Sequence, residues 1–287
     1  MKTKILTLLS ISCLLSSPTL ADDDRFKDVV ITPQKLTQTS YMFTGSGGNI
    51  GVSAGKDGIL IIDNQFAPLA DKITAALSSI QPGTPKYVVN THYHGDHTGG
   101  NNLFGISGII LAHHNVLKRL SSNTSYQPSA LPSITYHEGT TIHFNGDSLQ
   151  LLHMGPGHTD GDSIVLWADN SVVHMGDLFF KDKYPYIDLK AGGSVMGYRD
   201  NVAIVIDKIG SQTKVIPGHG GLATKDDLIR FKQMIDGSIN WMESQLSDGA
   251  TLRQVQEKGL PEQWKHWGWS FISEDKWIAT LYEGLKR

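Results

Sequence analysis

Apolar positions in the first quarter of the chain alternate with polar ones in a pattern that predicts β-strands. Residues 36–63 contain three such runs, "LTQTSYMFTG", "GNIGVSAG" and "GILIID", separated by glycine-rich turns. Residues 45–48, Gly-Ser-Gly-Gly, have the turn chemistry of a short hairpin loop. A helix is expected over 68–80, where apolar residues recur at helical spacing. Its apolar face contains Leu69, Ile73, Ala76 and Leu77.

Strands and helices continue to alternate along the rest of the chain. Short apolar runs predict strands over 86–90, 108–112, 141–144, 149–154, 163–168, 172–177 and 213–220. Helices are expected over 113–120 and 201–209, and the last stretch is expected to be helical. A polar loop over 121–133 separates two of these elements. Mixed strands and helices of this kind are typical of an α/β fold.

A further helix is predicted after Thr224, because Thr224 can cap a helix whose first turn contains Asp227. One face of this helix would be apolar. That face contains Leu228, Phe231, Ile235 and Met242. No repeat of fixed period and no low-complexity linker interrupts the pattern, so we expect a single domain over residues 22–287.

The first 21 residues differ from the rest of the chain. Lys2 and Lys4 precede an apolar run over 5–15, and Thr19-Leu20-Ala21 resembles a cleavage site, so residues 1–21 are predicted to be a signal peptide. The expected location is therefore periplasmic or secreted. The one cysteine, Cys13, lies in this leader and its surroundings fit a lipoprotein signal poorly, so the mature chain would have no disulfide.

The net charge of the chain bears on the kind of molecule that it binds. The formal net charge is -3, and removal of Lys2 and Lys4 with the leader would change it to -5. This balance argues against nucleic acid as a partner. No second long apolar run follows the leader, so we expect no membrane span. A small-molecule substrate is the expected partner, and the pattern carries no information on oligomeric state.

Metal-binding side chains are concentrated in "THYHGDHTGG", residues 91–100. Imidazole and carboxylate are ligands that zinc and similar divalent metals prefer. His92 and His94 are two positions apart, so both can point the same way from an extended segment. A turn at Gly95 would carry Asp96 and His97 towards a neighbouring site.

Three more candidate ligands follow apolar strands at loop positions where sites are commonly assembled. His158 lies in "GPGHTDGD" and His219 in "IPGHGG", both next to glycine. Asp177 ends the run "VVHMGD", where a carboxylate without a partner would be costly to bury. Histidine and carboxylate ligands with open positions are typical of a catalytic zinc site rather than a closed structural one.

These motifs resemble those of the metallo-β-lactamase superfamily through nearly the whole mature chain. The motifs that carry the resemblance are "THYHGDH", "GPGHTDGD", "HMGD" and "PGHG", in the order found in that family. The resemblance implies a four-layer αββα sandwich with a site in loops along one edge. It also implies that one metal is held by His92, His94 and His158, that a second is held by Asp96, His97 and His219, and that Asp177 bridges the two.

The resemblance implies a dizinc hydrolase, with iron or manganese as alternative metals. Two metals can hold a bridging hydroxide that attacks a small carbonyl substrate, and Asp96 would orient this hydroxide as the catalytic residue. Zinc β-lactamases of the best-known subclass have cysteine at the position of Asp177 and usually lack histidine at that of His97. The ligand set resembles glyoxalase II and lactonases instead, so β-lactamase activity is one hypothesis. Lactonase, thioesterase and phosphoesterase activity are the alternatives.

Two hypotheses from other classes remain open, an iron-dependent redox relative and a metal-binding protein without enzymatic activity. Metal content would identify the first. Loss of activity in Asp96→Asn with metal retained would exclude the second.

Other residues are predicted to support the site. Lys181, four residues after Asp177, is either a contact for a substrate carboxylate or an ordinary exposed lysine. Asp63 either orients the ligand loop through a hydrogen bond or is a plain strand-end carboxylate. The segment "WKHWGWSF" near the C-terminus is either an aromatic binding surface or, as we favour, packing against the last helices. The remaining histidines are predicted to be structural or exposed: His113, His114, His137, His143, His153, His174 and His266.

Overall fold

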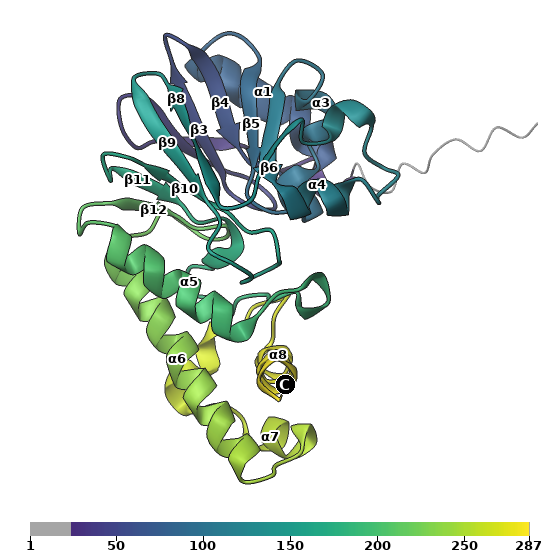
Figure 1. The fold of residues 1–287 in the computed structure, drawn as a ribbon, viewed down its shortest axis with the longest axis vertical. Helices are drawn as coiled ribbons and strands as arrows, with labels where there is room; N and C mark the ends of the chain where they lie inside the picture. Colours follow the sequence, from purple (N-terminus) through teal and green to yellow (C-terminus); the bar gives the residue numbers. More distant parts are fainter. Residues whose placement is uncertain (1–23, 287) are drawn as a thin grey trace, which may run out of the picture.

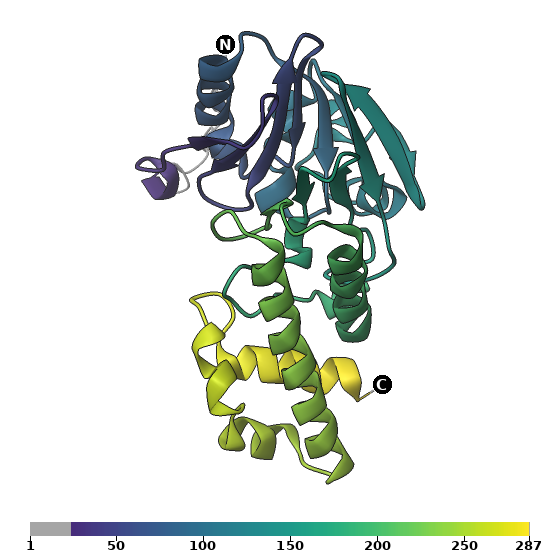
Figure 2. The same ribbon diagram turned by 90° about the vertical axis from the view of Figure 1, so that its left-hand side faces the viewer.

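The computed structural model describes residues 24–286 and has two β-sheets packed face to face, with helices on both outer sides (Figures 1 and 2). The predicted αββα sandwich is therefore confirmed. The predicted signal peptide over 1–21, together with Cys13, lies outside the described residues. No helix of the described part is both long and apolar enough to cross a membrane.

The first sheet has seven strands in the order β1-β2-β3-β4-β5-β6-β7. Its strands are β1 (Thr32–Lys35), β2 (Ser40–Thr44), β3 (Ile50–Gly55), β4 (Gly58–Ile62), β5 (Pro85–Asn90), β6 (Ile109–His113) and β7 (Ile134–Tyr136). Pairing is antiparallel from β1 to β4 and parallel from β4 to β7. The helices in this half are α1 (Ala70–Ile80), α2 (Gly95–Thr98), α3 (Asn101–Phe104) and α4 (His114–Leu120).

The second sheet has five strands in the order β12-β11-β10-β9-β8. Its strands are β8 (Gly139–Phe144), β9 (Asp147–Leu152), β10 (Ile164–Trp167), β11 (Val172–His174) and β12 (Lys214–Ile216). Only the pair β11 and β12 is parallel in this sheet. The helices in this half are α5 (Val195–Lys208), α6 (Lys225–Ser247), α7 (Leu252–Lys258) and α8 (Glu274–Leu285).

The period-two alternation of strand side chains accounts for the layers. In β4, Ile59 and Ile61 pack in the cluster that contains α1, whereas Leu60 and Ile62 pack in the cluster between the two sheets. In β10, Val165 and Trp167 face the same inter-sheet cluster and Ile164 faces the helices of the second half. A strand with apolar residues on both faces is buried from both sides, as these strands are.

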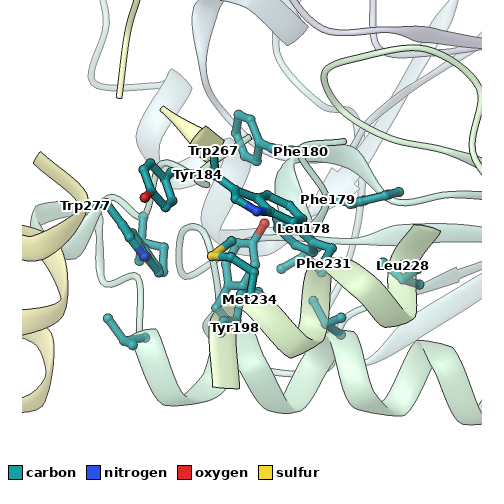
Figure 3. Packing of buried hydrophobic residues seen from close by; sticks show 14 of the residues in the cluster. Leu178, Phe179, Phe180, Tyr184, Tyr198, Leu228, Phe231, Met234, Trp267 and Trp277 are labelled. Atoms are coloured by element: carbon teal, nitrogen blue, oxygen red, sulfur yellow. The ribbon is translucent and has the colours of Figure 1, made fainter. Parts of the chain in front are cut away.

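A large apolar cluster joins the second sheet to the C-terminal helices. Figure 3 shows part of it, with Phe179, Tyr198, Phe231 and Trp267 packed together. α6 extends beyond the sandwich, and α8 packs against it there (Figures 1 and 2). The Nε1 atom of the buried Trp277 donates to Ser238 Oγ at 3.2 Å, which satisfies its polar atom inside this cluster.

The helix predicted after Thr224 is confirmed as α6. Thr224 and Asp227 form a capping box, and the four predicted apolar residues of this helix are buried. α5 begins at Val195 rather than at residue 201, because Ser194 Oγ accepts a hydrogen bond from Gly197 N and starts the helix earlier. Gly197 is a poor helix former, so the sequence pattern concealed this first turn.

We expect Thr224→Ala to lower the free energy of unfolding by about 1 kcal/mol, because the amides at the start of α6 lose their hydroxyl acceptor. Urea unfolding followed by circular dichroism measures the change. Ser78→Ala is the matched control, since Ser78 is exposed in the interior of α1. Equal losses in the two variants would show that the cap contributes nothing.

Candidate metal centre

The predicted ligands come from separate segments that end at one edge of the sandwich. His92 and His94 follow β5, and α2 supplies Asp96 and His97. The other three lie in the second half, with His158 after β9, Asp177 on the 3-10 turn Gly176–Leu178 after β11, and His219 after β12. The structure therefore brings together residues that are up to 127 positions apart in the sequence.

These side chains form two groups, each able to hold a metal ion. The first group is His92, His94, His158 and Asp177, and the second is Asp96, His97 and His219. Within each group, one ligand atom per residue lies within 4.8 Å of all the others.

Asp177 contacts both groups. Its Oδ1 lies 3.1 Å from His97 Nε2 and 3.3 Å from His219 Nε2. Its Oδ2 lies 3.4 Å from His158 Nε2 and 3.8 Å from His92 Nε2. A carboxylate between two groups in this way is suited to bridging two ions.

Several buried polar atoms in these groups indicate that they fit metal ions. His92 Nε2, His97 Nε2 and Asp177 Oδ1 are buried without a hydrogen-bond partner among the described residues. Such atoms are costly unless they are paired, and a coordinated cation would satisfy them. Two adjacent groups of histidine and aspartate are consistent with a binuclear metal centre.

Electrostatics in the second group also favours added positive charge. Burial would lower the pKa of His219, but Asp177 and Asp96 raise it to about 9. Burial likewise opposes a higher pKa at His97, yet the same two carboxylates and Asp63 raise this pKa well above its usual value. Carboxylates that stabilise a proton on a buried imidazole would also stabilise a metal cation.

In the first group, the pKa values of two histidines are lowered rather than raised. Burial lowers the pKa of His92 well below its usual value and that of His158 to about 4. Both imidazoles are therefore neutral at physiological pH and have a free lone pair, as metal ligation requires. Burial alone would raise the pKa of Asp177, but His97 and His219 hold it well below its usual range. Asp177 is thus ionised, as a bridging ligand must be.

Asp63 fixes the ligand segment through both of its carboxylate oxygens. It directly follows β4, is fully buried and has a left-handed backbone with φ of 62°. Oδ1 accepts from Thr91 N at 2.8 Å, and Oδ2 accepts from Thr91 Oγ1 at 2.7 Å. The same Oδ2 lies 2.7 Å from His97 Nδ1, which leaves Nε2 of that ring towards Asp177. Asp63 is thus placed where the predicted orienting role requires.

Two glycines, Gly48 in the loop over 45–48 and Gly218 in the motif "PGHG", leave space for the ligand side chains. A Cβ atom at Gly48 would lie 2.1 Å from His97 Cε1, and one at Gly218 would lie 2.1 Å from Asp177 Oδ1. Gly48 N also donates to Asp96 O at 3.0 Å, so the loop over 45–48 packs directly against the second group. Gly48 and Gly218 therefore have a steric reason.

Asp188 supports His94, and sequence reasoning missed it. Asp188 Oδ2 accepts from Tyr93 OH at 2.8 Å and lies 3.1 Å from His94 Nε2. His94 Nδ1 is directed instead at His158 Nε2, 2.8 Å away, which places this nitrogen in the first group. The hydrogen bonds from His94 and Tyr93 lower the pKa of Asp188. No motif marks Asp188, and it lies 94 positions from His94.

A cavity of about 700 Å³ opens beside both groups. His94, Asp96, Asp177 and His219 line it, so each group faces the cavity. Its other lining residues include Arg25, Phe66, Tyr93, Tyr186, Trp269 and Phe271. A volume of this size is in the range that holds a small-molecule ligand.

The structure does not bring Lys181 to this cavity. Lys181 Nζ donates to Leu222 O at 2.8 Å and lies 3.2 Å from Asp227 Oδ2, so its ammonium is engaged at the start of α6. A cation at the cavity is supplied instead by Arg25, whose guanidinium lies 5.0 Å from the Phe66 ring centroid. Arg25 stands in no recognisable motif, so no signal in the sequence identified it.

The aromatic segment "WKHWGWSF" has residues that pack in the core and residues that line the cavity. Trp267 is buried in the apolar cluster and Trp264 packs against it, as expected for packing. Trp269 and Phe271 line the cavity, as expected for a binding surface. His174 lies outside both metal groups and is buried, with Nε2 3.1 Å from Asn49 O, which agrees with its predicted structural role.

Comparison with known proteins gives a family match over more than half of the chain. Residues 44–219 match the model described as "Metallo-beta-lactamase superfamily", and this range includes all seven predicted ligands. A curated relative is the "Atrochrysone carboxyl ACP thioesterase" of Aspergillus terreus, which is 25% identical over 164 residues. That alignment covers 56% of this chain and 47% of the relative, so the chain spans about half the length of that protein.

Solved structures share the fold at low identity. The metallo-β-lactamase from Pontibacter korlensis aligns with a TM-score of 0.62 and 16% identity, covering 72% of this chain and 99% of that one. The DIM-1 metallo-β-lactamase aligns with a TM-score of 0.62 and 17% identity, covering 73% and 99%. The sec-alkylsulfatase Pisa1 from Pseudomonas sp. aligns with a TM-score of 0.70 and 13% identity, covering 88% of this chain and 50% of that one.

We expect Asp63→Asn to weaken metal binding by about 10- to 100-fold, because the amide removes the anionic acceptor that orients His97. Competition with a chromophoric chelator measures the affinity. Asp71→Asn, at an exposed position of α1, should bind metal as the unsubstituted protein does. Unchanged affinity in Asp63→Asn would remove the orienting role of this carboxylate.

We expect Gly48→Ala to bind about one metal ion per chain where the unsubstituted protein binds about two, because the new methyl group displaces the His97 ring. Metal analysis of the purified protein gives the stoichiometry. The control is Gly221→Ala, where a Cβ atom meets nothing within 4 Å. Two ions retained in Gly48→Ala would exclude His97 as a necessary ligand.

Proposed function

The chain belongs to the metallo-β-lactamase superfamily, and from this premise we propose that it is a dizinc hydrolase that cleaves an acyl thioester or ester of a small substrate. The observation that carries the proposal is the pair of histidine and aspartate groups that share Asp177 and face one cavity. In the proposed reaction, water adds to the acyl carbonyl and the C–S or C–O bond breaks. The products are a carboxylic acid and a thiol or alcohol.

Zinc is proposed because imidazole and carboxylate form the donor set of both groups. His92, His94 and His158 would hold one ion, and Asp96, His97 and His219 the other. When bound, two zinc ions would supply a Lewis acid and lower the pKa of water from 15.7 to about 7. Iron and manganese are the alternatives that metal analysis would detect.

Asp96 is proposed as the catalytic carboxylate. It lines the cavity and is 24% exposed, so its carboxylate can contact a water molecule there. Burial would raise the pKa of Asp96, but His97 and His219 hold it below the ordinary value. Asp96 is therefore ionised at neutral pH, and it can accept a hydrogen bond from the attacking water, orient it and take up its proton.

Neighbouring residues keep this arrangement rigid. Tyr93 and Asp188 hold the orientation of His94, and Asp63 holds that of His97. Ligands fixed by such contacts need little rearrangement during the reaction. A preorganised site of this kind is better suited to catalysis than a flexible one. His94 and His97 can thus keep their orientation while the substrate is converted to product.

Thioester hydrolysis is favoured by two observations. The ligand set contains Asp177 and His97 together, in contrast to the cysteine-containing set of the best-known zinc β-lactamases. The curated relative from Aspergillus terreus is named as a thioesterase, and its alignment with this chain supports this chemistry as a proposal.

β-Lactam hydrolysis is the second candidate, and Arg25 favours it. β-Lactams carry a carboxylate, and the Arg25 guanidinium lines the cavity near Phe66, where it could pair with that anion. A panel of chromogenic cephalosporin, acyl lactone, glutathione thioester and phosphate ester separates the candidates, with a chelated sample as control. Chelator-sensitive turnover of the thioester alone supports the first candidate, and turnover of the cephalosporin alone supports the second.

We expect Asp96→Asn to lower kcat by about 100-fold or more, because the amide cannot accept the proton that a carboxylate accepts. Steady-state kinetics on the substrate found in the panel gives the value, and metal analysis is made on the same sample. Asp207→Asn is the control, since Asp207 is exposed on α5 and does not line the cavity.

Full activity in a metal-loaded Asp96→Asn protein would contradict the catalytic role of Asp96. No turnover of any panel substrate by the unsubstituted, metal-loaded protein would instead favour a metal-binding protein without enzymatic activity.

A further inference from the structure

Three aromatic side chains form a continuous surface in the cavity, which we call the aromatic wall. It consists of Tyr186, Trp269 and Phe271. The ring centroid of Phe271 lies 5.4 Å from that of Tyr186 and 5.5 Å from that of Trp269. The interplanar angles are 73° and 56°, so the three rings present faces and edges in different directions rather than one flat stack.

The aromatic wall reaches both metal groups. The Tyr186 ring lies 5.7 Å from that of His94 and 5.6 Å from that of His158 in the first group. The Trp269 ring lies 6.1 Å from that of His219 in the second group. A molecule whose reacting carbonyl lies at the metal groups would therefore place its neighbouring atoms against these rings.

The wall is held in place by buried neighbours. Trp267 and Ile272 are 6% and 4% exposed, and they anchor the segment on either side of Trp269 and Phe271. Trp269 Nε1 donates to Tyr184 O at 3.0 Å, and Tyr184 N donates to Trp267 O at 2.8 Å. Figure 3 shows Trp267 and Tyr184 within the packed cluster. The segment is thus tied to the protein core at several points.

Phe271 is the most exposed of the three rings, whereas Tyr186 and Trp269 are half-buried against the apolar cluster. Lys276 Nζ lies 5.3 Å from the Phe271 ring centroid and leaves the rest of this ring open. Phe271 is 49% exposed, whereas its neighbours in sequence already complete the core. An exposed aromatic ring beside a cavity is typical of a surface that binds a ligand. Exposed apolar area that is covered on binding contributes roughly 25 cal/mol per Å².

We propose that the aromatic wall binds an aromatic acyl group of the substrate and so determines acyl specificity. The inference rests on the proposed acyl hydrolysis. An aromatic acyl group is favoured over a small one because tilted and edge-to-face ring pairs add attraction beyond area burial. Trp269 and Phe271 lie outside residues 44–219, so this specificity would come from a part of the chain beyond the family match.

The test compares phenylacetyl and acetyl thioesters of the same thiol, using the full metal-loaded chain. We expect kcat/KM to be at least about tenfold higher for the phenylacetyl substrate, and Phe271→Ala to reduce this ratio about tenfold. Phe271 is the better choice for substitution because it is exposed, while Trp269 also makes a structural hydrogen bond. Ile106→Ala is the control, since Ile106 is 72% exposed outside the cavity.

A binding measurement separates the aromatic wall from the reaction. Calorimetry with N-methylphenylacetamide, which resists hydrolysis, should give a Kd about tenfold weaker for Phe271→Ala and unchanged for Ile106→Ala. If no thioester is hydrolysed but this Kd still depends on Phe271, the proposed reaction fails and the aromatic wall stands. If both thioesters are hydrolysed equally and Phe271→Ala changes neither ratio nor Kd, the aromatic wall is overturned and the hydrolase stands.

Discussion

The Asp63 carboxylate lies at the end of β4, where it holds the segment after β5 by Thr91 and the α2 turn by His97. Its three contacts span two elements that carry four of the seven predicted ligands. Because the carboxylate is fully buried, each contact is made without competition from water. The left-handed backbone at Asp63 stores some strain, and the surrounding contacts offset it. The segments that carry the four predicted ligands of the first half of the chain are therefore tied together by one carboxylate.

Several of the polar side chains buried at this edge have partners within the site. Asp177 lies among imidazoles that hold it ionised, and His158 is fixed by a 2.6 Å contact from its Nδ1 to Tyr186 O. Asp162 is buried nearby, where Thr159 N and Oγ1 donate to it and desolvation raises its pKa to about 7. The loop that carries His158 is thus closed by its own hydrogen bonds.

The sequence predicted the parts of the site that depend on short-range pattern. His92 and Asp96 stand in one compact motif, so their proximity followed from local rules. The contact of Asp63 with Thr91 depends in addition on the parallel pairing of β4 with β5. Asp188 and Arg25 could not be predicted, because their contacts depend on how distant loops meet across the sandwich. The contacts of Lys181 could not be predicted for the same reason. Only the position of α6 shows that Leu222 and Asp227 take its ammonium.

Tyr186 has two contacts that belong to different parts of the site. Its carbonyl oxygen lies 2.6 Å from His158 Nδ1, while its ring faces the cavity beside Phe271. The carbonyl that contacts a candidate metal ligand and a ring that lines the cavity therefore belong to one residue. A backbone displacement at Tyr186 would move both together, so the geometry of the first metal group and the shape of the cavity are not independent of each other.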